Sequence, residues 1–401
     1  MEPRTYTIRD FYFWKISLSL GLASFFVFAC MYAVQPLLPL FVKEFGVTVS
    51  QSSLTLSLTI VGLIFGLIIL GFLSDRIGRT GFIKFSLIGS VVPFAILPLT
   101  DSFIIFVLLR FIQGFALAGL PAASLAFLSE EIDRKSVGVA TALYISSNAL
   151  GGMAGRVLSG YLTDLYSWEF SFYFLAIVGV VILCLVYFML PASRFFRSST
   201  VSVRKDVEGF LFHLKNPALL LVFGLGIVLQ FSFTGLWTYL PFHLQAEPFS
   251  LSLEAISYLF FAYGLGVVGS PFAGWLAGHY GLRPVRIAGV ITLSVGMLLT
   301  LSHSLVIIVI GLCITCLGFF TAHSLTATSV SEQAAHHKGS AASLYLVAYY
   351  IGVALGSSAL GPVWNLTGWT VLVILIALMP IVYFMFINIL SGKDKDQHRA
   401  Q

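Results

Sequence analysis

Two arginines and one histidine of this sequence lie well inside long apolar stretches: Arg110, Arg156 and His323. An arginine at such a position is costly and usually functional, because it binds an anion or ties neighbouring segments together. Imidazole titrates near neutral pH, so His323 could carry a proton. The sequence offers no nucleophile beside a base at one depth, no cluster of metal ligands and no nucleotide-binding loop. We therefore expect neither an enzyme nor a metal or cofactor site.

Polar and aromatic residues that share a helical face are the next candidates. Asn148 precedes Arg156 on one face, and Gln113 follows Arg110 on another. The remaining candidates form three pairs by the same spacing: Tyr32 with Gln35, Gln230 with Trp237, and Tyr345 with Tyr349. An aromatic wall with a few amides and hydroxyls suits an amphiphilic organic molecule. Hydrogen bonding between packed helices would use the same residue types, so this alternative stays open.

Long apolar segments must position these side chains. Hydrophobic residues make up 58% of the 401 residues and charged residues only 10%. A soluble domain would carry about 25% charged residues, so this chain needs lipid as its main solvent. A helix of ~20 residues crosses a bilayer and satisfies its own backbone hydrogen bonds. Twelve such helices are predicted, near residues 16–41, 53–73, 82–100, 103–129, 137–163, 170–190, 218–242, 254–277, 285–302, 304–330, 340–362 and 370–390.

The distribution of Lys and Arg predicts the orientation of these helices. With both termini in the cytoplasm, all 22 Lys and Arg fall in cytoplasmic segments except Lys43, Arg110 and Arg156. Positive residues concentrate on the cytoplasmic side of membrane proteins, so we expect both termini there. The net charge of +5 follows from this bias and indicates no nucleic-acid partner.

A charged hinge from Gly71 to Arg79 recurs in altered form at 274–283, about half a chain length later. A repeat at half length is typical of transporters built from two related bundles. The pattern predicts an all-α membrane protein with six helices in residues 1–190 and six in residues 217–401. A cytoplasmic linker over 191–216 would join the two halves.

Glycines four residues apart allow helices to approach closely. Such pairs occur in the predicted fifth helix, as Gly151 and Gly155, and in the eleventh, as Gly352 and Gly356. Because both helices also carry unusual polar residues, we expect these glycines to bring the two halves together.

Several motifs resemble those of the major facilitator superfamily. The run Gly71 to Arg79 matches the motif G-x-L-a-D-r-x-G-r between the second and third helices, and Arg110-x-x-Gln113-Gly114 matches R-x-x-q-G in the fourth. The fifth helix is similar to the antiporter motif g-x-x-x-G-P-x-x-x-G, with Arg156 where Pro is usual. Gln35-Pro36 and the run Gly318 to His323 resemble the bacterial YnfM-like and AraJ-like branch of exporters. The resemblance implies the major facilitator fold and alternating access.

The charged hinge has the features of a latch. The resemblance implies that Asp75 faces the start of the eleventh helix, near residues 339–343, and that Arg79 pairs with Glu130 or Glu131. A carboxylate near a helix N-terminus gains about 0.3–1 kcal/mol when it is exposed. The second copy has Gly278 where the acid would be, so we expect a latch on one half only. The expected gating residues are Gly71, Asp75, Arg76, Gly78, Arg79, Glu130 and Glu131.

Together these observations predict a secondary active transporter of the bacterial inner membrane. We expect a monomer that works as an antiporter and exports a small amphiphilic organic compound in exchange for protons. No Asp or Glu lies mid-helix, which argues against a dedicated cation exporter and leaves His323 as the buried proton carrier. Import or facilitated diffusion of a sugar or organic anion is the alternative within this class. A membrane-embedded enzyme and a non-transporting sensor are the alternatives from other classes.

Overall fold

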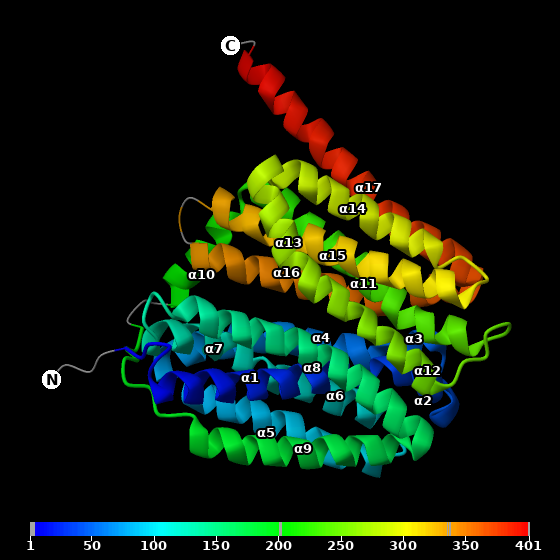
Figure 1. Ribbon diagram of the computed structural model, residues 1–401, viewed down its shortest axis with the longest axis horizontal. Helices are drawn as coiled ribbons and strands as arrows, with labels where there is room; N and C mark the ends of the chain where they lie inside the picture. Colours follow the sequence, from blue (N-terminus) through cyan, green and yellow to red (C-terminus); the bar gives the residue numbers. More distant parts are fainter. Residues whose placement is uncertain (1–4, 200–202, 335, 337, 400–401) are drawn as a thin grey trace. The chain divides into compact units, whose positions relative to one another are not determined.

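The computed structural model describes residues 5–199, 203–334, 336 and 338–399. The named elements in these ranges are all helices (Figure 1). Their contacts divide the chain into two compact units: unit 1 comprises Met1–Val201 and Ser250–Phe261, and unit 2 comprises Ser202–Phe249 and Ala262–Gln401. The segment Ser250–Phe261 follows the linker in sequence, yet it packs with unit 1.

Unit 1 contains most of the first half of the chain. Its α-helices are α1 (Phe11–Tyr32), α2 (Leu38–Glu44), α3 (Val49–Ser52), α4 (Leu54–Ile77), α5 (Thr80–Ile96), α6 (Phe103–Leu117), α7 (Gly119–Glu131), α8 (Val137–Leu165), α9 (Trp168–Met189) and α12 (Leu253–Tyr258). The predicted helix 16–41 is α1 and α2 joined by a short 3-10 turn, Gln35–Leu37. Pro36 and Pro39 lack an N–H, so the regular ladder of hydrogen bonds cannot continue unbroken through them. The predicted helix 103–129 is likewise divided into α6 and α7 at Ala118.

Unit 2 contains α10 (Val203–Leu214), α11 (Pro217–Gln245), α13 (Tyr263–Tyr280), α14 (Leu282–Leu299), α15 (Leu305–Gln333), α16 (Lys338–Ser358) and α17 (Gly361–Arg399). Helix α17 is interrupted at Gly368, whose φ of +70° lies in the left-handed region that glycine tolerates. The predicted last helix, 370–390, begins just after this break. Helix α10 lies in the predicted linker and packs on α11 and α16.

Eleven helices or helix pairs among the described residues are long and apolar enough to cross a membrane. The predicted twelfth segment, 137–163, forms the helix α8, but α8 is not one of the eleven. It carries Asn148 and Arg156 and a high share of small residues, which lower its hydropathy. The fold is therefore an all-helical, multi-pass one.

Close helix contacts occur at the glycine pairs, but within each unit. A Cβ on Gly151 or Gly155 of α8 would lie 2.0 or 2.3 Å from a backbone oxygen of α1. A Cβ on Gly352 or Gly356 of α16 would lie 2.5 or 2.4 Å from a backbone oxygen of α11. The expectation that these glycines bring the two halves together is therefore wrong: they pack α8 against α1 and α16 against α11. Spacing alone shows that a helix can be approached closely, but it does not identify its neighbour.

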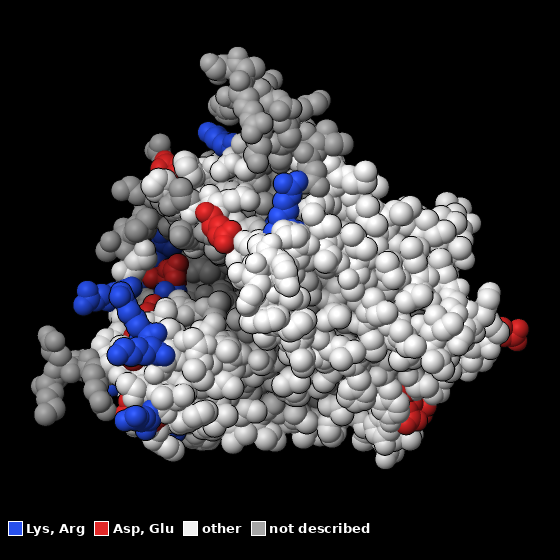
Figure 2. All heavy atoms as spheres, turned by 45° about the horizontal axis from the view of Figure 1, so that its top comes forward, with Lys and Arg blue, Asp and Glu red and all other residues white. Residues whose placement is uncertain are grey.

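The outer surface of each unit is apolar. Large hydrophobic side chains are widely exposed, among them Phe188 at 78% in unit 1 and Val268 at 73% in unit 2. Figure 2 shows broad areas that carry no Lys, Arg, Asp or Glu among the described residues. Exposed apolar surface on this scale needs lipid rather than water as its solvent.

Candidate functional site

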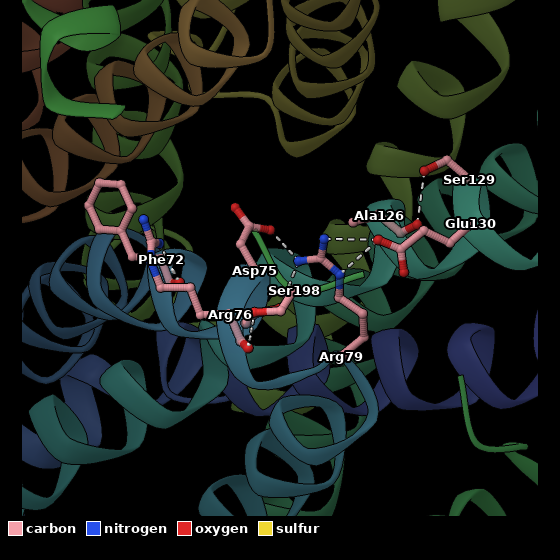
Figure 3. A network of polar contacts seen from close by, with 9 residues as sticks. Phe72, Asp75, Arg76, Arg79, Ala126, Ser129, Glu130 and Ser198 are labelled. Atoms are coloured by element: carbon pink, nitrogen blue, oxygen red, sulfur yellow. Dashed lines mark hydrogen bonds and ion pairs between the residues drawn. The ribbon is translucent and has the colours of Figure 1, made fainter. Parts of the chain in front are cut away.

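The charged hinge lies at the C-terminal end of α4 and is shown in Figure 3. Arg79 donates to Asp75 four residues earlier and to the Ser74 hydroxyl at 3.1 Å. Arg76 turns back along α4 and donates to the Phe72 carbonyl at 2.9 Å. Gly78 ends the helix with a φ of +131°, which explains the glycine in the motif. The hinge therefore contains one carboxylate, Asp75, and two guanidinium groups with different partners: Arg79 binds side chains, and Arg76 binds a carbonyl of its own helix.

Glu130, near the end of α7, is the acidic partner of Arg79. Its Oε1 accepts from Arg79 Nη2 at 2.9 Å and from Nε at 3.2 Å, and this fork geometry ties α7 to the α4–α5 hinge. Burial by itself lowers the pKa of Arg79, but the hydrogen bonds and charges of Glu130 and Asp75 outweigh burial and raise that pKa above its usual value. Arg79 therefore stays cationic at every physiological pH. This pairing selects Glu130 from the two partners that the sequence left open.

Glu131 has a different set of partners. Its side chain is fully buried and accepts from the Ser193 hydroxyl, from the backbone N–H groups of Arg194 and Phe195, and from the Arg194 guanidinium. The two adjacent carboxylates at the end of α7 thus bind in two directions, Glu130 to the hinge and Glu131 to the start of the linker. The sequence placed both residues in the gating motif without separating these roles.

Arg156 lies on a polar wall of unit 1. Its side chain is 4% exposed, and its guanidinium donates to Gln35 Oε1 and to the Gly152 carbonyl, both at 2.7 Å. The guanidinium carbon lies 3.9 Å from the centre of the Tyr32 ring and 5.3 Å from that of Phe260, within the range of cation–π attraction. Tyr32 and Gln35, from the end of α1 and the 3-10 turn after it, were predicted apart from Arg156 of α8, and the structure brings the three together.

Two neighbouring positions complete this wall. A Cβ on Gly152 would lie 3.3 Å from Arg156 Nη1 and 3.4 Å from the Tyr32 ring, so even an alanine would require the guanidinium to shift by a few tenths of an ångström. Asn148, one turn before Gly152 in α8, accepts a hydrogen bond from the Ser24 hydroxyl of α1. The wall thus combines a cation, an amide and aromatic faces, which could bind an anionic or amphiphilic molecule.

Arg110 lies in the interior of unit 1 and is fully buried. It donates to the carbonyls of Cys30 at 3.2 Å and Met31 at 2.9 Å in α1, to the Thr55 carbonyl of α4 at 3.2 Å, and to the Gln113 amide oxygen. Gln113 in turn donates to the Ser90 carbonyl of α5 at 2.9 Å. This motif therefore joins α6 to three other helices. A direct role of either residue in binding or coupling stays a prediction.

His323, in α15 of unit 2, lies in an aromatic stack. The Tyr345 hydroxyl of α16 is 2.9 Å from His323 Nδ1. The imidazole is parallel to Phe319, with ring centres 5.5 Å apart, and lies 4.9 Å from the Tyr349 ring. Phe319 in turn stacks on Phe233 of α11 at 3.9 Å. The structure therefore brings together the predicted candidates His323, Tyr345 and Tyr349.

The two candidates of α11 lie beside this stack. Gln230 is 3% exposed, and its amide nitrogen donates to the Thr234 hydroxyl at 3.2 Å. Its amide oxygen is buried and has no hydrogen-bond partner among the described residues. Trp237 is fully buried, with its ring 4.9 Å from that of Tyr263. Gln230 is thus a buried acceptor with capacity for a further donor.

Two parts of these sites were missed by sequence reasoning. Phe233 and Phe319 form the centre of the unit 2 stack, but their sequence surroundings are as apolar as those of any lipid-facing phenylalanine. The contacts of residues 193–199 with the hinge were also missed. The sequence held one signal for the linker contacts: of the two adjacent carboxylates at the end of α7, only one can pair with Arg79, so the other needs a different partner.

The sequence model described as Major Facilitator Superfamily matches residues 20–357 and 222–401. Together with the fold and the hinge motif, this match places the chain in the major facilitator superfamily, so it is a secondary transporter and a multi-pass membrane protein.

Individual relatives agree with this assignment. The inner membrane transport protein YnfM of Escherichia coli (strain K12) is 33% identical over 370 residues, which cover 92% of this chain and 89% of YnfM. The cis,cis-muconate transport protein of Acinetobacter baylyi (strain ATCC 33305 / BD413 / ADP1) is 26% identical over 253 residues and 60% of each chain. The expected resemblance to the YnfM-like branch is confirmed.

A solved structure shares the fold. It is a bacterial homologue of the human lysosomal transporter Spinster, in an inward-facing and occupied conformation, with a TM-score of 0.77 and 15% identity. The match covers 94% of this chain and 96% of that one.

Proposed function

We propose that this transporter is a proton-coupled exporter of a small amphiphilic organic compound that works as a monomeric antiporter by alternating access. It would reside in the bacterial inner membrane, as the name of YnfM states for that relative. The pairing of His323 with Tyr345 inside an aromatic stack is the observation that carries the proposal. It places the titratable imidazole of α15 beside a hydroxyl, among rings that suit an amphiphilic ligand.

His323 is the proposed proton carrier. A carrier needs a group that titrates near the working pH and a partner that holds the reacting nitrogen in place. Tyr345 supplies that partner at Nδ1, and the stacked Phe319 fixes the plane of the ring. Rings of Tyr349 and Trp237 and the amide of Gln230 would contact the substrate in this unit.

The polar wall of unit 1 is the proposed second contact surface for the substrate. Arg156 is held by Gln35 and Gly152 while its planar face lies against Tyr32. A guanidinium fixed in this way can orient a polar group of the substrate, while Tyr32 contacts its apolar part.

The hinge is the proposed cytoplasmic gate. Asp75 would engage the N-terminal end of α16 in the state that is closed to the cytoplasm, and Arg79 with Glu130 would hold the hinge in shape. Interactions of a few kcal/mol that exist in one state only can shift a two-state equilibrium without freezing it.

Transport of an organic anion is a second candidate, and Arg156 is the observation that favours it. An arginine buried to this extent suits a carboxylate, with which it can form two parallel hydrogen bonds. The relative from Acinetobacter baylyi is named for transport of cis,cis-muconate, which is a dicarboxylate.

Transport in proteoliposomes under an imposed pH gradient tests both candidates. Purified protein would be screened against dyes, sugars and organic acids, with the gradient in each direction and with an uncoupler as control. Proton-dependent movement of amphiphilic dyes supports the exporter, and proton-dependent movement of dicarboxylates supports the anion transporter. Transport that is equally fast with the gradient collapsed would contradict proton coupling.

A further inference from the structure

The first seven residues of the linker after Ala192, Ser193–Ser199, lie against the cytoplasmic hinge of unit 1. We call this segment the strap. Its Ser198 hydroxyl donates to the Arg76 carbonyl at 2.8 Å (Figure 3), and its Ser199 N–H donates to the Asp75 carbonyl at 2.9 Å. Phe196 contributes its ring, centred 5.6 Å from the Arg79 guanidinium carbon. The strap therefore contacts all three charged residues of the hinge: Asp75, Arg76 and Arg79.

The hydrogen bonds of the strap with α4 have a clear physical basis. The last four carbonyl groups of a helix have no partner within the helix. In α4 these are the carbonyls of residues 74–77, and the Gly78 N–H donates to the first of them, that of Ser74. The Ser199 N–H donates to the Asp75 carbonyl and the Ser198 hydroxyl to the Arg76 carbonyl. The strap thus caps the helix that carries the gating motif.

Glu131 anchors the other end of the strap. Its buried carboxylate accepts from two consecutive backbone N–H groups of the strap, from the Ser193 hydroxyl and from the Arg194 guanidinium. Arg194 also lies 3.8 Å from the centre of the Tyr6 ring, and the Tyr6 N–H donates to the Glu131 carbonyl at 2.9 Å. A buried carboxyl group that accepts from this many donors forms strong bonds, so Glu131 fixes the strap rather than merely touching it.

Docking of the strap shortens the tether between the units. Only residues 200–202 separate Ser199 from Val203, where α10 of unit 2 begins. A chain of this length spans at most about 14 Å between the Cα atoms of Ser199 and Val203. If the strap left unit 1, the free chain from Ala192 to Val203 could span about 40 Å.

We propose that Glu131 and the strap are positioning elements of transport that limit how far the cytoplasmic ends of the two units can separate. While the strap is docked, α10 cannot move beyond the reach of the short tether, and the carbonyls of Asp75 and Arg76 stay capped. The proposal rests on the proposed alternating-access function, because only a transporter whose units move apart needs such a limit.

Two measurements on the full chain test the proposal without a known substrate. The first is tryptic cleavage after Arg194 and Arg197, with fragments assigned by mass, because a protease needs the strap to leave its binding surface. The second is the distance distribution between spin labels at Arg134 of unit 1 and Leu211 of α10, both exposed, in a background without the native cysteines. Both are recorded for Glu131→Gln and for Asp133→Asn, which changes a neighbouring carboxylate that accepts from the Lys135 N–H of its own loop.

We expect Glu131→Gln to be cleaved about tenfold faster and to populate longer label distances, since it loses a charged acceptor of several bonds. Asp133→Asn should behave like the parent. If Glu131→Gln does not fold, Ser199→Pro replaces it, because proline removes the N–H that donates to the Asp75 carbonyl. Ser198→Ala, which removes the hydroxyl that donates to the Arg76 carbonyl, is a second substitute. Its control is Ser129→Ala, which removes a hydroxyl that bonds only within α7 among the described residues.

Unchanged cleavage in a folded Glu131→Gln, or faster cleavage with unchanged label distances, would overturn the proposal. Failure of this proposal can be distinguished from failure of the proposed function. Proteoliposomes that fail to transport any compound, combined with longer distances in Glu131→Gln, would remove the exporter assignment and leave the strap as a limit on separation.

Discussion

At the residue scale, one histidine defines the proposed chemistry. His323 is bonded at Nδ1 to the Tyr345 hydroxyl and is stacked on Phe319. We expect His323→Gln to bind substrate and catalyse downhill exchange but to fail in concentrating substrate against a gradient, because the amide keeps a polar group and cannot titrate. Uphill transport in proteoliposomes measures the loss of coupling.

Full uphill transport by His323→Gln with the parental pH profile would mean that the proton takes another route, or that there is no proton coupling. Tyr345→Phe is the matched variant, and we expect it to keep coupling with an altered pH profile.

The two buried arginines should respond differently to the same change. Arg110 donates to the carbonyls of Cys30 and Met31 in the last turn of α1, so Arg110→Ala removes the side-chain donor of two buried carbonyls and should cost about 3 kcal/mol or more, with loss of all transport. Arg156 lies on the wall with Tyr32 and Gln35, so Arg156→Ala should change substrate preference with a smaller loss of stability. Thermal unfolding in detergent and transport of a substrate panel separate the two effects. Equal and complete loss of transport in both variants, with both folded, would remove this distinction.

At the scale of the elements, helix α8 depends on glycine for its contact with α1. A Cβ on Gly151 would lie 2.0 Å from the Phe25 carbonyl oxygen, far below contact distance. Gly151→Ala must therefore push the two helices apart, and we expect a loss of about 1–3 kcal/mol, measured by thermal unfolding. Gly138, near the start of the same helix, has no atom within 4 Å of its Cβ position. Gly138→Ala should be neutral or stabilise by up to about 1 kcal/mol. A similar response of both variants would contradict this packing.

At the scale of the whole molecule, the gating motif should control the equilibrium between states. We expect Asp75→Asn to weaken the closed cytoplasmic gate and to lower transport while the protein stays folded, because the amide loses the charge that pairs with Arg79 and that we propose to act on the N-terminal end of α16 in the closed state. Distances between spin labels on the cytoplasmic ends of α4 and α16 report the state of the gate. An unchanged distance distribution without substrate would show that Asp75 is no latch. A variant of the second copy, Gly278→Ala, is the control, because no atom lies within 4 Å of its Cβ position.

The amino-acid sequence by itself determined the class of the protein. Apolar length, the bias of Lys and Arg and the half-length repeat depend only on local composition and order, and the membrane limits such segments to helices. The hinge motif and the family that it resembles likewise pointed to Asp75, Arg79 and an acidic partner of Arg79. Helical spacing can group residues on one helix, such as Asn148 with Arg156, because that period is a local property. In the structure Asn148 bonds to Ser24 of α1 and Arg156 to Gln35 of the turn after α1.

Contacts between helices were decided only by the tertiary structure. Spacing could not show that Gly151 faces α1, that His323 meets Tyr345, or that Glu130 and Glu131 bind in opposite directions. Each of these contacts joins segments far apart in the chain, and in an apolar helix many faces are equally apolar. Which face meets which neighbour depends on close packing and on the satisfaction of buried polar groups across the whole bundle. The docking of the linker follows from the same physics: its partners on α4 are backbone carbonyls, which every sequence has, and its partner on α7 is the Glu131 carboxylate, whose neighbours the sequence does not show.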